Sequence, residues 1–253
     1  MILAAQLLEQ YPQLTCHACD FSKRAVDFVK THRLYDPARV NAFVYDLCST
    51  SEPSLASVVN GASSSSGPDQ GKGTIGPPTI ISMIFVLSAI PPTLHERALR
   101  SLVSCFRASY HLASESNSSS SITDSSSGED SYIPHATVLF RDYCLDDMAQ
   151  TRFDAKNHTL ASYHEPTLLS LTEPYYRRGS DNTLAYFFDP TSLAALAKRC
   201  GLDGEVLVRE RVVENRKAGK VMRRRFVQAR WRVRKDALNQ TLATKEAPKS
   251  ETR

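Results

Sequence analysis

Three aspartates follow apolar runs of the sequence, where a carboxylate could bind the polar groups of a ligand. Asp20 ends LTCHACD, Asp46 follows VNAFVY, and Asp142 follows ATVLFR. In a parallel sheet, ligands bind at the carboxyl ends of the strands, where side chains of successive loops meet. We expect Asp20 to accept hydrogen bonds from the hydroxyl groups of a ribose. The alternative is that Asp20 caps the helix beginning near Ser22.

The elements that would position these aspartates alternate along the chain. Apolar runs typical of strands are separated by amphipathic stretches typical of helices. Strands are predicted over 14–20, 40–47, 79–90 and 136–143, helices over 3–9, 22–32, 93–109 and 191–200, and two final alternating strands over 205–216 and 221–233. This order predicts an α/β fold with a mostly parallel sheet and an antiparallel C-terminal hairpin.

Three stretches are too polar to contribute to a core. Residues 49–78 and 112–134 are rich in Ser, Gly and Pro, and residues 236–253 form a polar tail. Such segments bury too little apolar area to offset the entropy of ordering. We expect two disordered insertions in surface loops and a disordered tail, with one domain over residues 1–235.

Positive charge is concentrated near the C-terminus. Residues 209–235 contain twelve Lys and Arg against two acids, so this segment carries about +10 and the rest of the chain about −6. Such a basic patch favours a polyanionic partner, most often a nucleic acid. The alternative is that charge on an edge strand protects the sheet from aggregation.

The 253 residues contain no long uncharged apolar run and no recognisable secretory signal. We therefore expect no contact with a membrane and a cytoplasmic location, with nucleus and mitochondrion left open. The six cysteines are expected to be reduced thiols. Cys16 and Cys19 have the spacing of a metal-binding pair, but strand residues three apart point to opposite faces. No metal site is expected.

Several strings resemble one family when they are taken in order. They are ACDFSKRAVDFVK, YDL, ISMIFVLSAIPP, VLFRDY, TLAYFF and ENRKAGKVMRRRFVQARW. Together they resemble the eukaryotic tRNA 3-methylcytidine methyltransferases, over nearly everything outside the insertions and the tail. The resemblance implies a Rossmann-like class I methyltransferase fold and S-adenosyl-L-methionine (SAM) as methyl donor. It also implies cytidine in the tRNA anticodon loop as acceptor, and a helper protein such as seryl-tRNA synthetase.

The resemblance also suggests which residues bind the ligands. Cofactor contacts are expected from Asp20, Asp46, Leu47 and Ile84. RNA contacts are expected from a set of mostly basic residues near Asp142 and in the C-terminal hairpin, namely Arg141, Tyr143, Arg178, Arg216, Arg223, Arg224 and Arg230. Arginines that contact phosphates increase the affinity for RNA without conferring sequence specificity.

One departure from the family concerns the start of the chain. Family members begin the domain with a strand and a glycine-rich loop that holds the methionine end of SAM, whereas this sequence starts at the helix that follows, which ends in LLEQYP. We therefore expect an N-terminally truncated domain that binds SAM weakly. It is either a fragment of an enzyme or a degenerate, non-catalytic module that binds RNA or a protein partner.

Asp142 is the candidate catalytic residue. Cytosine N3 carries its own lone pair, so methylation there depends on orientation and on stabilising the positive charge of the product ring. A carboxylate suits this role because it accepts a hydrogen bond from the cytosine amino group. The alternatives are that Asp142 pairs with Arg141 or caps the next helix. An unstacked base could lie between aromatic rings, for which the candidates are Phe85, Tyr143, Tyr186 and Phe187, most of them expected in the core.

Overall fold

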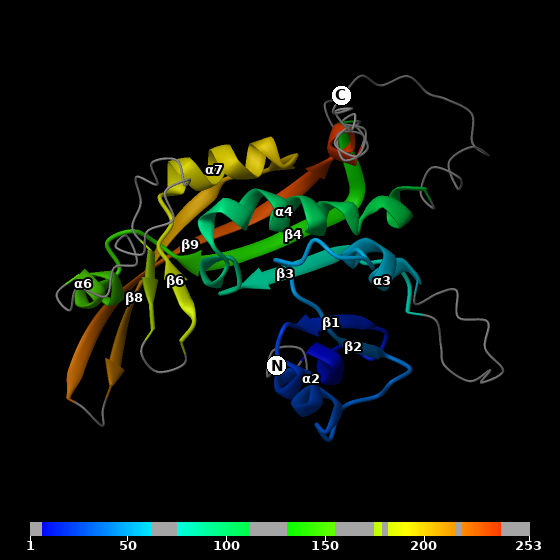
Figure 1. Cartoon of the computed structure of the whole chain (residues 1–253), viewed down its shortest axis with the longest axis horizontal. Coiled ribbons are helices and arrows are strands. Elements are labelled where there is room, and N and C mark those ends of the chain that lie inside the picture. The colour runs from blue at the N-terminus through cyan, green and yellow to red at the C-terminus, as the bar shows by residue number, and fades with distance from the viewer. Residues whose placement is uncertain are drawn as a thin grey trace, which may run out of the picture. The chain divides into compact units, whose positions relative to one another are not determined.

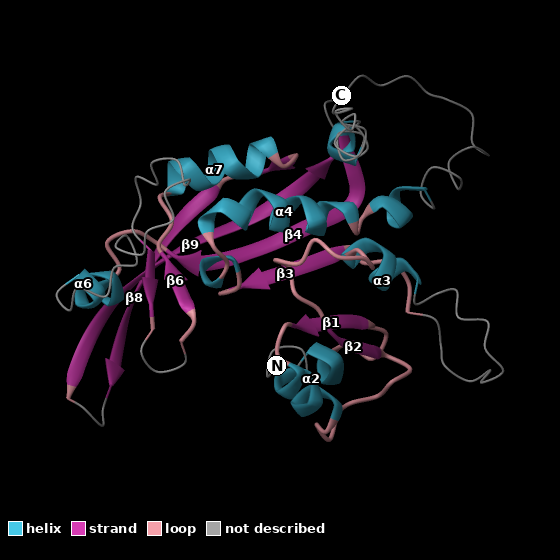
Figure 2. Cartoon of the chain, viewed as in Figure 1, coloured by secondary structure: helices cyan, strands magenta, loops and turns pink. Residues whose placement is uncertain are grey.

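A computed structural model describes residues 7–61, 75–111, 131–154, 175–178, 182–215 and 219–238. Figures 1 and 2 show the chain by position and by secondary structure. The chain divides into two compact units. Unit 1 comprises Met1–Thr79 and Ser101–Ser126, and unit 2 comprises Ile80–Arg100 and Ser127–Arg253. The single domain expected over residues 1–235 stays a prediction.

Unit 1 is built around two short parallel strands. Strand β1 (Cys16–Asp20) pairs with β2 (Val40–Val44), so that Asp20 lies opposite Val44. Helix α2 (Lys23–Lys30) connects them and is capped by Ser22, whose side chain accepts a hydrogen bond from the Ala25 N–H. Helix α3 (Leu55–Gly61) follows β2. A small apolar cluster of Leu8, Val26, Val40 and Ala42 forms the core of β1, β2 and α2.

Unit 2 contains a five-stranded mixed sheet. The strands are β3 (Ile80–Ile84), β4 (Tyr132–Tyr143), β7 (Leu202–Asp203), β8 (Val206–Asn215) and β9 (Lys220–Arg234). Their order is β3-β4-β9-β7, with β8 also paired to β9. The pair β3–β4 is parallel, and the three pairs that involve β9 are antiparallel. The long hairpin of β8 and β9 is visible in Figure 2.

The remaining elements of unit 2 are helices and one small antiparallel sheet. They are the 3-10 turns η1 (Leu87–Ala89) and η2 (Pro92–Leu94), the start of helix α4 (His95–Ser104), helix α6 (Met148–Asp154), strands β5 (Tyr175–Arg177) and β6 (Leu184–Tyr186), and helix α7 (Pro190–Arg199). Asp189 caps α7 by accepting a hydrogen bond from the Ser192 N–H.

The two faces of the five-stranded sheet differ in burial. Because strand side chains alternate between faces, one face carries fully buried residues such as Val138, Phe140 and Trp231. The other face carries Leu139 and Ile80, which are 39% and 60% exposed, together with arginines of β8 and β9. This exposed face runs to Tyr143 at the end of β4, whereas the buried face carries Asp142.

The α/β class and the antiparallel C-terminal hairpin are confirmed. The strand predicted over 79–90 is shorter than expected, because β3 ends at Ile84 and Phe85 adopts a positive φ of 56°. Some expectations for polar stretches were wrong. Helix α3 lies within the expected insertion 49–78, and β4 begins at Tyr132, inside 112–134.

The tail predicted from residue 236 also begins later than expected. Residues 235–238 form a helical turn in which Ala237 and Leu238 are buried. Of the two insertions and the tail, residues 62–74, 112–130 and 239–253 lie outside the described residues. Among the described helices, each is too short or too polar to cross a membrane.

Candidate functional site

Asp142 lies near the end of β4 and is completely buried. Its Oδ2 accepts a hydrogen bond from the Ser88 N–H at 2.9 Å, and its Oδ1 accepts one from the Tyr143 N–H at 2.9 Å. The first bond ties β4 to η1, so the carboxylate caps this turn and not the next helix. Within the described residues it makes no ion pair with Arg141. Asp142 therefore fixes the loop that follows β3.

Burial and hydrogen bonding shift the pKa of Asp142 in opposite directions. Burial disfavours the charged form and raises the pKa of Asp142 to about 6, although hydrogen bonds from Ser88 and Tyr143 and the nearby Arg178 charge lower it. At neutral pH the carboxylate is thus mostly ionised. The site holds a buried negative charge that can stabilise a cation beside it.

Three aromatic rings meet at the end of β4, and we call them the aromatic triad: Phe85, Tyr143 and Phe226. The ring centroids of Phe85 and Tyr143 are 4.9 Å apart, and those of Phe85 and Phe226 are 5.6 Å apart. Phe85 is 39% exposed and Tyr143 is half-buried. By contrast, Tyr186 and Phe187 are buried, as expected of core aromatics. Phe85 and Tyr143 remain as rings that a ligand can reach.

Three arginines lie over the aromatic triad. The Arg141 guanidinium carbon is 4.4 Å from the centre of the Phe226 ring, and that of Arg178 is 5.2 Å from the Tyr143 ring. Arg224 lies between these two rings, 5.5 Å from Tyr143 and 5.4 Å from Phe226. Cations at such distances are attracted to the ring faces. The region combines stacking surfaces with donors for oxygen atoms, as recognition of single-stranded RNA requires.

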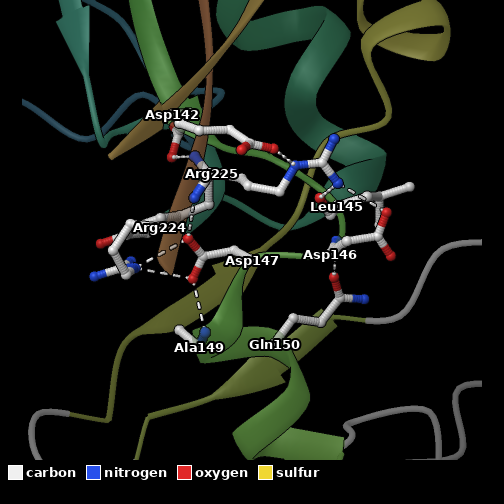
Figure 3. A network of polar contacts seen from close by, with 10 residues as sticks. Asp142, Leu145, Asp146, Asp147, Ala149, Gln150, Arg224 and Arg225 are labelled. Atoms are coloured by element: carbon white, nitrogen blue, oxygen red, sulfur yellow. Dashed lines mark hydrogen bonds and ion pairs between the residues drawn. The ribbon is translucent and has the colours of Figure 1, made fainter. Parts of the chain in front are cut away.

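A second buried aspartate supports this region and was missed by the sequence reasoning. Asp147 accepts hydrogen bonds from the Arg224 Nε, the Arg225 backbone N–H and the Ala149 backbone N–H (Figure 3). The Ala149 bond lies in the first turn of α6, so an acid just before a helical stretch was the available sequence signal. The two bonds from β9 have no sequence signal, because they join residues far apart in the chain.

The basic residues of β9 divide between its two faces. Arg224, Arg230 and Phe226 share one face by alternation, and Arg230 is exposed. Arg223 lies on the opposite face of β9, away from Arg224 and Phe226. Arg216 lies outside the described residues.

The expected cofactor residues are distributed over both units. In unit 1, Asp20 Oδ1 accepts from the Ser22 N–H and Asp46 Oδ1 from the Cys48 N–H, both at 2.8 Å. Both aspartates are exposed and follow the carboxyl ends of the parallel strands β1 and β2. Leu47 beside them is half-buried, and Ile84 in unit 2 is 38% exposed. In each aspartate the second oxygen accepts no hydrogen bond from the described residues.

A solved structure shares this fold. The crystal structure of a SAM-dependent methyltransferase from Anabaena variabilis matches 92% of this chain and 72% of its own chain, with a TM-score of 0.51 and 12% identity. This likeness supports a Rossmann-like methyltransferase fold. No protein-family model matches the sequence.

Curated relatives match most of the chain. The tRNA N(3)-methylcytidine methyltransferase trm141 of Schizosaccharomyces pombe is 31% identical over 231 residues, which are 91% of this chain and 72% of the relative. The tRNA N(3)-cytidine methyltransferases METTL6 of Homo sapiens and METTL2 of Bos taurus are each 30% identical, over 89% and 87% of this chain. The chain spans 60% of METTL6 and 44% of METTL2. By its similarity to trm141, the chain belongs to the family of tRNA N(3)-cytidine methyltransferases.

Proposed function

We propose that this protein transfers the methyl group of SAM to N3 of cytidine in the anticodon loop of a tRNA. The observation that carries the proposal is the position of Asp142, a buried carboxylate near the end of β4, directly before Tyr143, whose accessible ring contacts Phe85. Family membership supports the same chemistry, because the relatives are named for methylation of cytidine N3 in tRNA.

The reaction needs little acid–base catalysis. SAM supplies a methyl group on a positively charged sulfur, and the lone pair of cytosine N3 attacks that carbon. The new N–C bond replaces the S–C bond, so the positive charge moves from the sulfur to the base and no proton needs to be removed. Asp142 contributes by accepting a hydrogen bond from the cytosine amino group and by stabilising the charge on the ring.

The residues around Asp142 hold the base. Phe85 and Tyr143 offer faces on which an unstacked cytosine can stack. Arg141, Arg178 and Arg224 offer N–H donors for the oxygen atoms of the nucleotide. Arg230 continues this donor surface along β9 and contacts phosphates further along the RNA.

The carboxyl ends of β1 and β2 fit the nucleoside part of SAM. Asp20 and Asp46 each offer one carboxylate oxygen without a partner among the described residues, which suits the hydroxyl groups of a ribose. Leu47, beside Asp46, supplies apolar surface for the adenine. These three residues of unit 1 hold the cofactor, while those around Asp142 hold the base.

The partner and compartment complete the proposal. The RNA partner is tRNA, assisted by a helper protein such as seryl-tRNA synthetase, and the reaction takes place in the cytoplasm. All six cysteines are free thiols, which is typical of proteins in a reducing compartment.

The test is a methylation assay on the full chain with total tRNA and SAM, read by mass spectrometry of the digested nucleosides. Because SAM is expected to bind weakly, the assay uses a large excess of SAM. We then expect 3-methylcytidine with the parent protein and a rate about 100-fold or more lower with Asp142→Asn, the loss typical when one electrostatic stabiliser is removed. Asp146→Asn, a nearby exposed aspartate, is the matched control. Binding of tRNA by the parent without any 3-methylcytidine would contradict the proposal and favour a non-catalytic RNA-binding module.

A further inference from the structure

Asp147 is a buried carboxylate that the chemistry proposed above does not use. It is fully buried and lies between the end of β4 and the start of α6. Figure 3 shows its two oxygens pointing at three donors from two separate parts of the chain. A buried carboxylate is retained at low cost only when its oxygens are satisfied in this way. Each of these bonds therefore fixes its donor tightly.

The side-chain donor among the three is Arg224. Its Nε lies 3.0 Å and 2.9 Å from the two oxygens of Asp147. The Arg225 and Ala149 backbone N–H groups each donate at 2.7 Å. The backbone bonds anchor the carboxylate, and the anchored carboxylate then sets the orientation of the guanidinium.

Arg224 is held at the place where Tyr143 and Phe226 meet. Its guanidinium carbon is almost equally far from the centres of both rings, at 5.5 Å and 5.4 Å. Only Nε is bonded to Asp147, and within the described part of the chain the two terminal nitrogens donate to no other group. Ion pairing with Asp147 cancels the net charge, so Arg224 offers directed N–H donors more than long-range attraction.

We infer that Asp147 is a positioning residue for methyl transfer, and that it acts by orienting Arg224 across the aromatic triad. This inference rests on the proposed function. The oriented terminal nitrogens of Arg224 donate to an oxygen of the target nucleotide and hold its base against Tyr143. A guanidinium has the planar shape that this task needs, whereas a lysine ammonium cannot lie across two rings and bond a carboxylate in the same geometry.

The test compares Asp147→Asn, Arg224→Lys and the double variant in the full chain. We expect each single variant to lower kcat about 100-fold, the loss typical of a small misplacement of the reacting groups. The KM for tRNA should change by less than about threefold, because phosphate contacts elsewhere dominate affinity. The double variant should be no slower than either single one, because both changes remove the same oriented guanidinium.

A second readout does not depend on methylation. A short single-stranded oligocytidine that carries one pyrrolocytosine is titrated with each protein, and quenching reports stacking of the fluorescent base on an aromatic ring. We expect quenching with the parent and with the control Asp146→Asn, whose side chain is exposed and pairs with Arg225. Quenching should be largely lost with Asp147→Asn and with Arg224→Lys.

The possible outcomes separate the two claims. If the parent quenches the probe but makes no 3-methylcytidine, the proposed function fails, and the quenching of the variants still decides the role of Asp147. If both single variants melt like the parent, methylate within about threefold of its kcat and quench the probe equally, the inference is wrong. If Asp147→Asn does not fold, Arg224→Lys and Arg224→Gln decide, because Asp147 keeps its two backbone bonds in both.

Discussion

At the scale of single residues, Asp142 destabilises the folded protein at neutral pH and also takes part in the proposed methyl transfer. The carboxylate is removed from water by burial, and the backbone N–H groups of Ser88 and Tyr143 donate to it. The increase of its pKa to about 6 means that the folded protein binds this proton more tightly than the unfolded chain. The free energy of folding is therefore less favourable at neutral pH than at low pH on account of this group.

The first prediction concerns the stability of Asp142→Asn. At pH 8 the increase in the pKa of Asp142 corresponds to about 3 kcal/mol of destabilisation of the folded parent. In the variant, the loss of one backbone hydrogen bond offsets about 1 kcal/mol of the stability gained by removing the charge. We expect the variant to be about 2 kcal/mol more stable than the parent at pH 8, measured by urea unfolding. The gain should shrink as the pH falls below about 6 and disappear near pH 4, where the unfolded carboxyl also becomes protonated. An equal gain at both pH values would exclude the buried charge as its cause.

Residues near strand ends could be predicted, and residues that depend on distant contacts could not. Asp142 and Tyr143 follow an apolar run, so their place at the end of a strand follows from the local pattern. Phe226 reaches Tyr143 only through the pairing of β4 with β9. That pairing joins residues more than 80 positions apart, and no local pattern specifies it.

At the scale of elements, the end of β3 shapes the site. Phe85 donates its backbone N–H to the Arg141 carbonyl at 2.8 Å, which extends the parallel pairing by one residue. Its φ of 56° then turns the chain sharply toward η1. Left-handed backbone is unfavourable for a residue with a Cβ. The strain is located where an aromatic ring must lie against Tyr143, which fits a functional position.

The second prediction compares Phe85→Gly with Phe85→Ala. Both variants lack the ring, but only glycine adopts a positive φ without strain. We expect the glycine variant to be the more stable of the two in urea unfolding, by up to about 1 kcal/mol. Both variants should lose quenching of the pyrrolocytosine probe to a similar extent. A more stable alanine variant would contradict the assignment of strain to this residue.

The third prediction concerns α3, which the sequence pattern did not reveal. Leu55 and Val59 are 3% and 4% exposed, so α3 buries apolar side chains although the surrounding residues are polar. We expect Leu55→Ala to cost about 2–3 kcal/mol of unfolding free energy, as for other buried leucines. Ser57→Ala on the exposed side of α3 should change stability by less than about 0.5 kcal/mol. Equal urea midpoints for these two variants would show that α3 does not pack.

Elements with a strong period could be predicted from the sequence, and short ones in polar surroundings could not. The strands β1, β2 and β4 and the helices α2 and α7 agree in type with the patterns that predicted them. Helix α3 was missed because a short apolar group, Leu55 to Val59, beside a serine-rich stretch gives too weak a period. The end of β3 was misplaced because the apolar run continues through η1, where residues such as Leu87 are buried without being in a strand.

At the scale of the whole molecule, the uneven charge distribution of the sequence becomes a surface of the sheet. Arg209 and Arg211 of β8 and Arg230 of β9 lie on the same face as the aromatic triad, by strand alternation and register. All three are exposed, and none forms an ion pair with a described residue. This face presents unpaired cations next to the proposed base site. Arg223 lies on the other face of the same strand and serves as an internal comparison.

The last prediction follows from this asymmetry. Each arginine that contacts a phosphate releases counterions on binding, so its loss lowers the slope of log affinity against log salt by about 0.7 to 0.9. We expect Arg230→Gln to lower the slope by that amount and the combination of Arg209→Gln, Arg211→Gln and Arg230→Gln to lower it by about 2, in filter binding with tRNA over a salt series. Arg223→Gln removes the same charge but should leave the slope nearly unchanged. Equal slopes for Arg230→Gln and Arg223→Gln would mean that net charge, and not this face of the sheet, determines the binding of RNA.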